Sequence, residues 1–150
     1  PPNHASLTWS DARLLGFAPM DAVHEEFYRV VQAMLLSDAD HMLENLNAFE
    51  EHAIAHFDQE DGWMRDTEFP PRDCHLEEHA AVLNSVREVR QLLSRGQGGL
   101  ALLQDFATYL LEWFPGHSDY LDSALAAWMS KRHYGGKPVV LRRKLPLIRS

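Results

Sequence analysis

The chain has 150 residues, of which 45% are hydrophobic, so it is long enough and apolar enough to form one domain with a buried core. Its net charge of −8 argues against general nucleic-acid binding, and no apolar run approaches the roughly 20 residues that span a bilayer. Cys74 is the single cysteine, which excludes an internal disulfide. With no basic-then-apolar leader pattern, these features predict a cytoplasmic protein without a membrane span.

The charge is distributed unevenly along the chain. Residues 131–150 contain seven lysines and arginines and no acid, which leaves a net charge of −15 on residues 1–130. Residues 133–150 are therefore expected to form a basic C-terminal extension. Two interpretations stay open: a solvated or self-packed tail, or a contact surface for an acidic protein partner, a neighbouring subunit or an anionic surface.

The N-terminal part of the chain predicts an arm followed by a helix. Residues 1–19 are expected to pack across the helices of the domain as an arm. A first helix is predicted over residues 21–36, where apolar side chains recur at helical spacing, and Asp21 after Pro19 is a suitable N-cap. The arm contains large apolar side chains that can pack in this way, among them Trp9, Leu15 and Phe17.

Three further helices are predicted over residues 40–64, 72–94 and 100–132. A proline pair separates the first two, the glycine-rich residues 95–99 end the next, and Pro115-Gly116 is expected to kink the last. Four helices with short connections predict an all-α fold, namely an up-down-up-down antiparallel four-helix bundle. This domain, which includes the arm, is expected to span residues 1–132.

Side chains that bind metals recur on the expected inner face of every helix. A single inward histidine is more often a hydrogen-bonded core residue than a ligand. Five histidines and two carboxylates weaken that interpretation, because such groups are costly to bury unless they are paired or bound to metal. Nitrogen and oxygen donors without thiolate fit iron, manganese or zinc, and seven donors favour two metals over one tetrahedral zinc. The candidate ligands are His24, His56, Glu60, His75, His79, His117 and Asp122.

Helical spacing sorts these candidates. Glu60 follows His56 by one turn, whereas His52 lies about 12 Å from Glu60 along the axis and is interpreted as a neighbour of the site or a solvated residue. His117 and Asp122 are five residues apart, about 140° around an ideal helix. Both can face the core only if the helix is locally distorted, and the preceding proline-glycine pair supplies a reason.

In this order and at this spacing, the motifs resemble those of the hemerythrin family, specifically the bacterial hemerythrin-like domains. The family pattern is one histidine on the first helix, H-x-x-x-E on the second, H-x-x-x-H on the third and H-x-x-x-x-D on the fourth. The resemblance extends over roughly residues 7–130, including Trp9, the LGF at 15–17 and Trp113. The matching segments are MDAVH ending at His24, HFDQE at 56–60, HLEEH at 75–79 and HSDYLD at 117–122.

The resemblance implies two non-haem iron ions with a bridging oxo or hydroxo group, and O2 as their ligand. It implies that His75, His79 and His117 hold one iron and that His24 and His56 hold the other, with Glu60 and Asp122 as bridges. The second iron then has one protein nitrogen fewer and an open position for dioxygen. Glu77 and Glu78, between the histidines of the third motif, are expected to be exposed.

The resemblance also implies an oxygen pocket, for which aromatic residues and one serine are candidates. Similar family members commonly have leucine and isoleucine where this chain has Phe114 and Ser118. These departures predict a differently shaped and wetter pocket, in which oxidation to the di-ferric form is faster. The candidate lining residues are Phe27, Phe57, Trp113, Phe114 and Ser118.

Four interpretations compete at this point. The first is reversible binding of dioxygen for storage, delivery or sensing, and it is favoured because no positioned acid or base beyond the ligands supports turnover. The alternative is a di-iron redox enzyme or sensor that handles peroxide or nitric oxide. The third is a signalling or interaction module, in which the metal state repositions the N-terminal arm or the tail at residues 131–150 and so signals oxygen. The fourth is a bundle that carries zinc or no metal. Besides dioxygen, the expected partner is a protein or a second subunit that contacts this tail.

Overall fold

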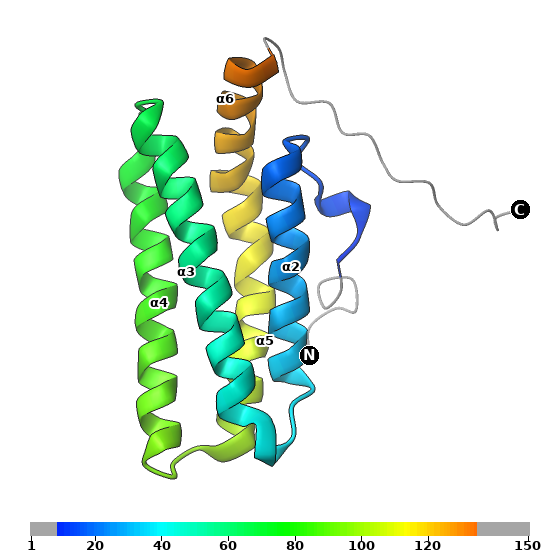
Figure 1. Cartoon of the computed structure of the whole chain (residues 1–150), viewed down its shortest axis with the longest axis vertical. Helices are drawn as coiled ribbons and strands as arrows, with labels where there is room; N and C mark the ends of the chain where they lie inside the picture. Colours follow the sequence, from blue (N-terminus) through cyan, green and yellow to red (C-terminus); the bar gives the residue numbers. More distant parts are fainter. Residues whose placement is uncertain (1–8, 135–150) are drawn as a thin grey trace, which may run out of the picture.

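The computed structural model describes residues 9–134, and within this range the fold is helical and contains no strand. Four long helical stretches lie side by side, which confirms the predicted all-α class and is consistent with a helical bundle (Figure 1). No helix of the described range is long and apolar enough to cross a bilayer. The predicted basic extension falls outside this range except for its first two residues, as does the first part of the arm.

The helix boundaries agree closely with the predicted ones. The second and third predicted helices and most of the fourth are reproduced to within two residues at each end. Two short 3₁₀ turns, η1 (Asp11–Arg13) and η2 (Ala39–His41), precede the first and second long helices. The long elements are α2 (Ala18–Leu35), α3 (Met42–Asp66), α4 (Arg72–Ser94) and α5 (Gly99–His117), the last continuing through the π-helical turn η3 (Ser118–Asp122) into α6 (Ser123–Tyr134).

The first long helix begins earlier than predicted. It starts at Ala18 because Pro19 fits in the first turn, where a backbone N–H needs no helical partner. Asp21 is therefore not the N-cap. Its buried carboxylate instead accepts hydrogen bonds from the backbone N–H groups of Leu15 (2.7 Å) and Gly16 (3.1 Å). Gly16 has φ +89°, a conformation that favours glycine, so the carboxylate holds a tight turn in the arm.

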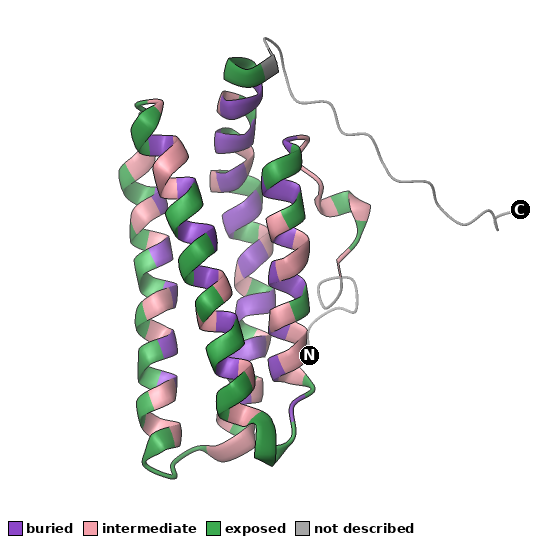
Figure 2. Cartoon of the chain, viewed as in Figure 1, coloured by how far each residue is buried: buried purple, intermediate pink, exposed green. Residues whose placement is uncertain are grey.

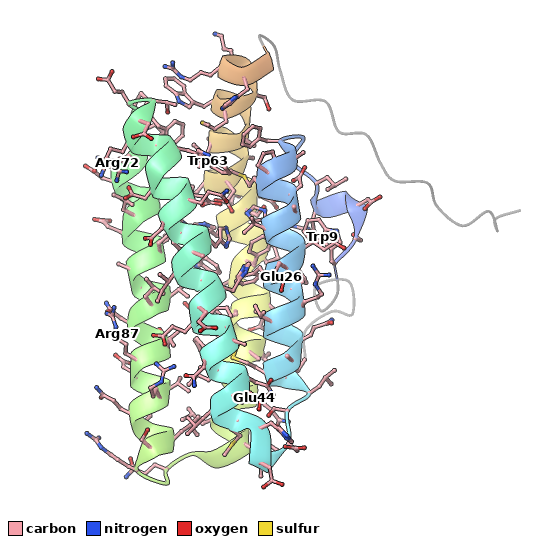
Figure 3. All side chains as sticks on the ribbon, in the orientation of Figure 1. Trp9, Glu26, Glu44, Trp63, Arg72 and Arg87 are labelled. Carbon is pink, nitrogen blue, oxygen red and sulfur yellow. The ribbon has the colours of Figure 1, made fainter. Side chains whose placement is uncertain are left out.

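The arm packs on the helices, as predicted, over its described residues. Trp9 lies beside α2 and makes an edge-to-face contact with Tyr28, with ring centroids 5.7 Å apart (Figure 3). Phe17 is buried and makes a similar contact with Trp63 of α3 at 5.2 Å. These aromatic contacts fix the arm across α2 and α3.

The buried side chains lie on the sides of the helices that face one another (Figure 2). They form two apolar clusters, a larger one around Phe27 and Leu110 and a smaller one around Met20 and Met64. Along α2, His24 lies between Met20 of the smaller cluster and Phe27 of the larger one. A layer of buried polar groups thus separates the two apolar parts of the core.

The π-helical turn η3 is the distortion that the spacing of His117 and Asp122 required. The backbone N–H of Ser123 donates to the carbonyl oxygen of Ser118, five residues earlier, so the turn contains one residue more than an α-helical turn. Both side chains therefore point into the core, where Nε2 of His117 lies 3.1 Å from Oδ1 of Asp122. The preceding Pro115 lies inside α5 and lacks the N–H that an α-helical turn uses.

The larger apolar cluster should supply much of the stability of the fold. Leu110 is completely buried in it, so Leu110→Ala should lower the free energy of unfolding by about 2–5 kcal/mol. Leu36 is 80% exposed, so Leu36→Ala should change the free energy of unfolding by less than about 0.5 kcal/mol. Urea denaturation followed by circular dichroism checks both values. Equal losses in the two variants would contradict the assignment of the core.

Candidate metal centre

The seven candidate ligands are brought together in the buried polar layer. They come from all four long helical stretches, and each is at most 3% exposed. Their donor atoms form two groups, each with all of its atoms within 4.8 Å of one another, and Glu60 belongs to both groups. The first group is Glu60, His75, His79, His117 and Asp122, and the second is His24, His56 and Glu60.

Glu60 reaches the two groups with its two different oxygens. Oε2 lies 2.9 Å from Nε2 of His56 and 3.5 Å from Nε2 of His24. Oε1 lies 3.2 Å from Nε2 of His75 and 3.3 Å from Nε2 of His79. One carboxylate therefore faces two sets of histidines on opposite sides.

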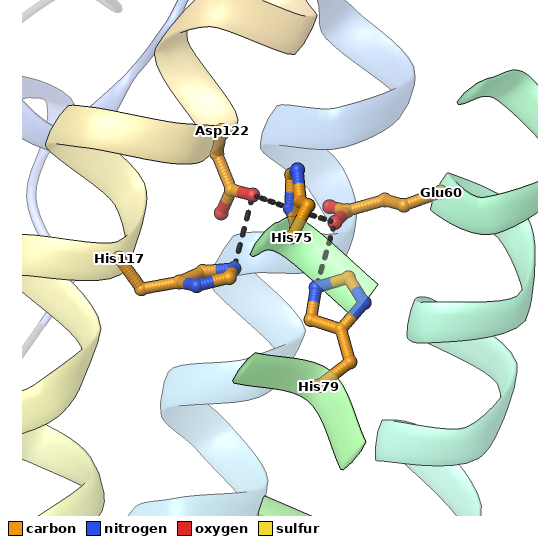
Figure 4. Close-up of side chains that lie close together, drawn as sticks. All are labelled: Glu60, His75, His79, His117 and Asp122. Atoms are coloured by element: carbon orange, nitrogen blue, oxygen red, sulfur yellow. Dashed lines mark hydrogen bonds and ion pairs between the residues drawn. The ribbon is translucent and has the colours of Figure 1, made fainter. Parts of the chain in front are cut away.

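Asp122 has the same arrangement from the opposite wall of the site (Figure 4). Its Oδ2 lies 3.1 Å from Nε2 of His24, while its Oδ1 lies 2.8 Å from Nε2 of His75 and 3.1 Å from Nε2 of His117. Two carboxylates are thus shared between a three-histidine end and a two-histidine end. The three-histidine end is His75, His79 and His117, and the two-histidine end is His24 and His56.

Opposite charges compensate one another across this layer. Burial opposes a charge on His24, but the carboxylates of Asp122 and Glu60 outweigh it and raise the pKa of His24 to about 10. In the same way the carboxylates raise the pKa of His75 to about 9. Burial would raise the pKa of both carboxyl groups, yet the surrounding imidazoles hold it well below its usual range. The site therefore keeps two carboxylates ionised in the protein core.

The donor atoms are better arranged to bind metal ions than to form hydrogen bonds with one another. Among residues 9–134, several buried donor atoms make no hydrogen bond of suitable geometry, although they lie close to one another. They are nitrogens of His24, His79 and His117 and oxygens of Glu60 and Asp122. Buried polar atoms without partners are rare because each is costly. Divalent cations between the nitrogens and carboxylates would satisfy these atoms, and a nitrogen and oxygen donor set fits iron, manganese or zinc.

His52 lies outside both groups, as predicted from its distance along α3. Its ring is 5.4 Å from that of His56, and it is half-buried. Burial and the neighbouring imidazoles of His56 and His24 lower the pKa of His52 to about 4. It is therefore an uncharged neighbour of the site at neutral pH.

The predicted pocket residues divide between the two ends. Phe114 makes an edge-to-face contact with His24 at 5.0 Å and stacks on Phe27 at 4.8 Å, which places both rings at the two-histidine end. Phe57 stacks on His79 at 3.9 Å and Trp113 stacks on His117 at 4.4 Å, both at the three-histidine end. The fifth predicted residue, Ser118, is buried, and its hydroxyl makes no hydrogen bond within the described residues.

Glu78 was missed by the sequence interpretation, which expected it to be exposed. It is half-buried, and its Oε1 accepts a hydrogen bond from Nδ1 of His117 at 2.7 Å. This contact fixes the ring so that Nε2 is left for the centre. The other four candidate histidines have no such partner for Nδ1 within the described residues. Glu78 lies three residues after His75 and therefore on the same side of α4, and this spacing could have indicated that it lies near the site. Glu77 is exposed, as predicted.

Comparisons with known proteins agree with this geometry. Residues 15–128 match the family model described as the hemerythrin HHE cation binding domain. The chain is 36% identical over 126 residues to a bacteriohemerythrin from Ralstonia nicotianae (strain ATCC BAA-1114 / GMI1000), which covers 84% of this chain and 90% of that protein. No solved structure matches the chain.

The Glu78 contact can be tested on the metal-loaded protein. Glu78→Ala removes the acceptor that orients His117, so metal affinity should fall by about 10–100-fold, as is typical for such partners. Glu77→Ala alters an exposed neighbour and should leave the affinity unchanged. Metal release to an excess of chelator measures both. Release at the wild-type rate from the Glu78 variant would show that the hydrogen bond does not position the ring.

Proposed function

This chain belongs to the hemerythrin family, and we propose that it is a non-haem di-iron protein that binds dioxygen reversibly. The proposal is carried by one observation: Glu60 and Asp122 each direct one oxygen to the three-histidine end and the other to the two-histidine end. Carboxylates shared in this way suit two cations, because their negative charge lowers the repulsion between the ions. A single metal would leave one set of histidines unused.

These distances support the ligand sets that the resemblance to the family implies. His75, His79 and His117 would hold one iron, and His24 and His56 would hold the other. Glu60 and Asp122 would bridge the two ions together with an oxo or hydroxo group. The single thiol, Cys74, is exposed and takes no part. A donor set of imidazoles and carboxylates without thiolate is compatible with iron.

The protein side chains would provide an enclosed site with one free position. A di-iron pair supplies two electrons for the reversible binding of dioxygen. The two-histidine end has one nitrogen fewer, so a metal held there would keep the free position. The stacked rings of Phe27 and Phe114 exclude water from one side of this end. Water exclusion protects a reduced site from oxidation side reactions.

Oxygen binding is favoured over turnover by the state of the neighbouring side chains. His52 contacts His56 and is a candidate for an additional acid near the two-histidine end. Burial and the neighbouring imidazoles lower its pKa to about 4, which disfavours the imidazolium form at neutral pH. A general acid for peroxide or nitric oxide chemistry would need a pKa near the working pH.

The direction of the four long helices is also part of the proposal. The short connections between the long helices support the up-down-up-down antiparallel order. A domain over residues 1–132, a cytoplasmic location and a partner contact through the basic tail stay predictions.

The ligand assignment predicts different outcomes for two histidines. His79→Ala should reduce the iron content by about one ion per chain or more, because loss of a ligand weakens both metal binding and folding. His52→Ala should leave the iron content near that of the wild type. Iron analysis of the purified proteins checks both. Full iron content in the His79 variant, or a large loss in the His52 variant, would contradict the ligand set.

The function itself can be followed by absorption spectroscopy. The dithionite-reduced protein should gain near-ultraviolet and visible charge-transfer bands when air is admitted, and it should lose them under argon. Reversible bands require the open position and the enclosed site together. A spectrum that passes directly to a stable di-ferric form would favour the redox enzyme or sensor instead.

A further inference from the structure

A groove lies on the surface between α2 and α3, with a volume of about 380 Å³. It is built from the outer sides of both helices, and several of its residues are exposed or half-buried. Its lining residues are Ala22, Val23, Glu26, His52, Ala55, His56 and Gln59.

The inner wall of the groove includes His56, a proposed ligand at the two-histidine end. His56 is only 3% exposed, and its Nε2 lies 2.9 Å from Oε2 of Glu60. The groove therefore reaches a residue of the two-histidine end, at which the proposed free position would lie.

Several other sides of the site are covered by aromatic rings. Phe57 stacks on His79 and Trp113 stacks on His117, so rings cover two histidines of the three-histidine end. Phe27 and Phe114 form a stacked pair beside the two-histidine end. Such closely packed rings leave little space for passage.

The α2–α3 side has small residues instead. Ala22 and Ala55 are both exposed, and their methyl groups leave space between the two helices. His52 is half-buried in the groove, and its Nε2 is a buried atom that makes no hydrogen bond within the described residues. The groove thus combines small and apolar side chains with the polar side chains of Glu26, His52 and Gln59, and its volume admits small molecules such as dioxygen and azide.

We propose that this groove is the route by which dioxygen and small anions such as azide enter and leave the two-histidine end, and that Ala55 and His52 set its width. The inference rests on the proposed function, because the route needs a metal centre at its inner end. It adds two residues that control the rate of ligand exchange without holding the metal.

A route has a kinetic signature that separates it from a binding site. A side chain that a ligand only passes changes the barrier in both directions, so the association and dissociation rate constants change by the same factor. The dissociation constant, which is their ratio, stays constant. A side chain that contacts the bound ligand alters this ratio, mainly through the dissociation rate constant.

The experiment measures azide binding to the di-ferric protein by stopped-flow absorption. Ala55→Phe should slow both association and dissociation by at least about tenfold, equivalent to about 1.4 kcal/mol added to the barrier. His52→Ala should widen the groove and accelerate both. Ala101→Phe, at an exposed alanine on α5 that does not line the groove, is the matched control and should keep the wild-type rates.

Each alternative result has a distinct meaning. Wild-type rates in both the Ala55 and His52 variants would overturn the route. A changed dissociation constant with an unchanged association rate would also overturn it, because the residues would then shape the bound site. If azide produces no spectral change in the wild-type protein, the proposed di-iron function fails and the route fails with it. Opposite rate changes in the two variants at constant affinity would support the proposal.

Discussion

The structure depends on one electrostatic constraint: seven polar side chains, two of them ionised carboxylates, are buried in the middle of a helical core. Burial of such groups is costly unless opposite charges or metal ions compensate them. Here Glu60 and Asp122 lie between five imidazoles, and the pKa of His24 is raised to about 10 in response. Apolar clusters on both sides of the layer hold the helices at the spacing that these contacts need.

Several local features position the buried polar side chains or cover them. The π-helical turn η3 adds one residue to a turn, so that His117 and Asp122 both face inward. Glu78 then holds the outer nitrogen of His117, while Trp113 covers its ring. At the two-histidine end the coverage is lighter, because alanines instead of aromatic rings separate α2 and α3 on the groove side. This difference between the ends supports the proposed function, in which ligands would exchange at the two-histidine end only.

Much of this arrangement was predictable because it follows helical periodicity. The helix ranges, the pairing of His56 with Glu60 and the need for a distortion before Asp122 all depend on spacing within one helix. Contacts between helices, or between the arm and a helix, are harder to predict from the sequence. The sequence pattern predicts a helix cap at Asp21, whereas its carboxylate accepts a hydrogen bond from the turn at Gly16. It also predicts an exposed Glu78, whereas this side chain contacts His117 on another helix. Which rings stack on which histidines also depends on the helices' relative rotation, which spacing alone does not specify.

In the proposed function, two metal ions are shared by the two carboxylates. Anomalous diffraction at the iron edge, from crystals of the iron-loaded protein, tests it most directly. Two peaks are expected, with Glu60 and Asp122 between them. One should lie beside His75, His79 and His117 and the other beside His24 and His56. A single peak, or peaks away from these carboxylates, would contradict it.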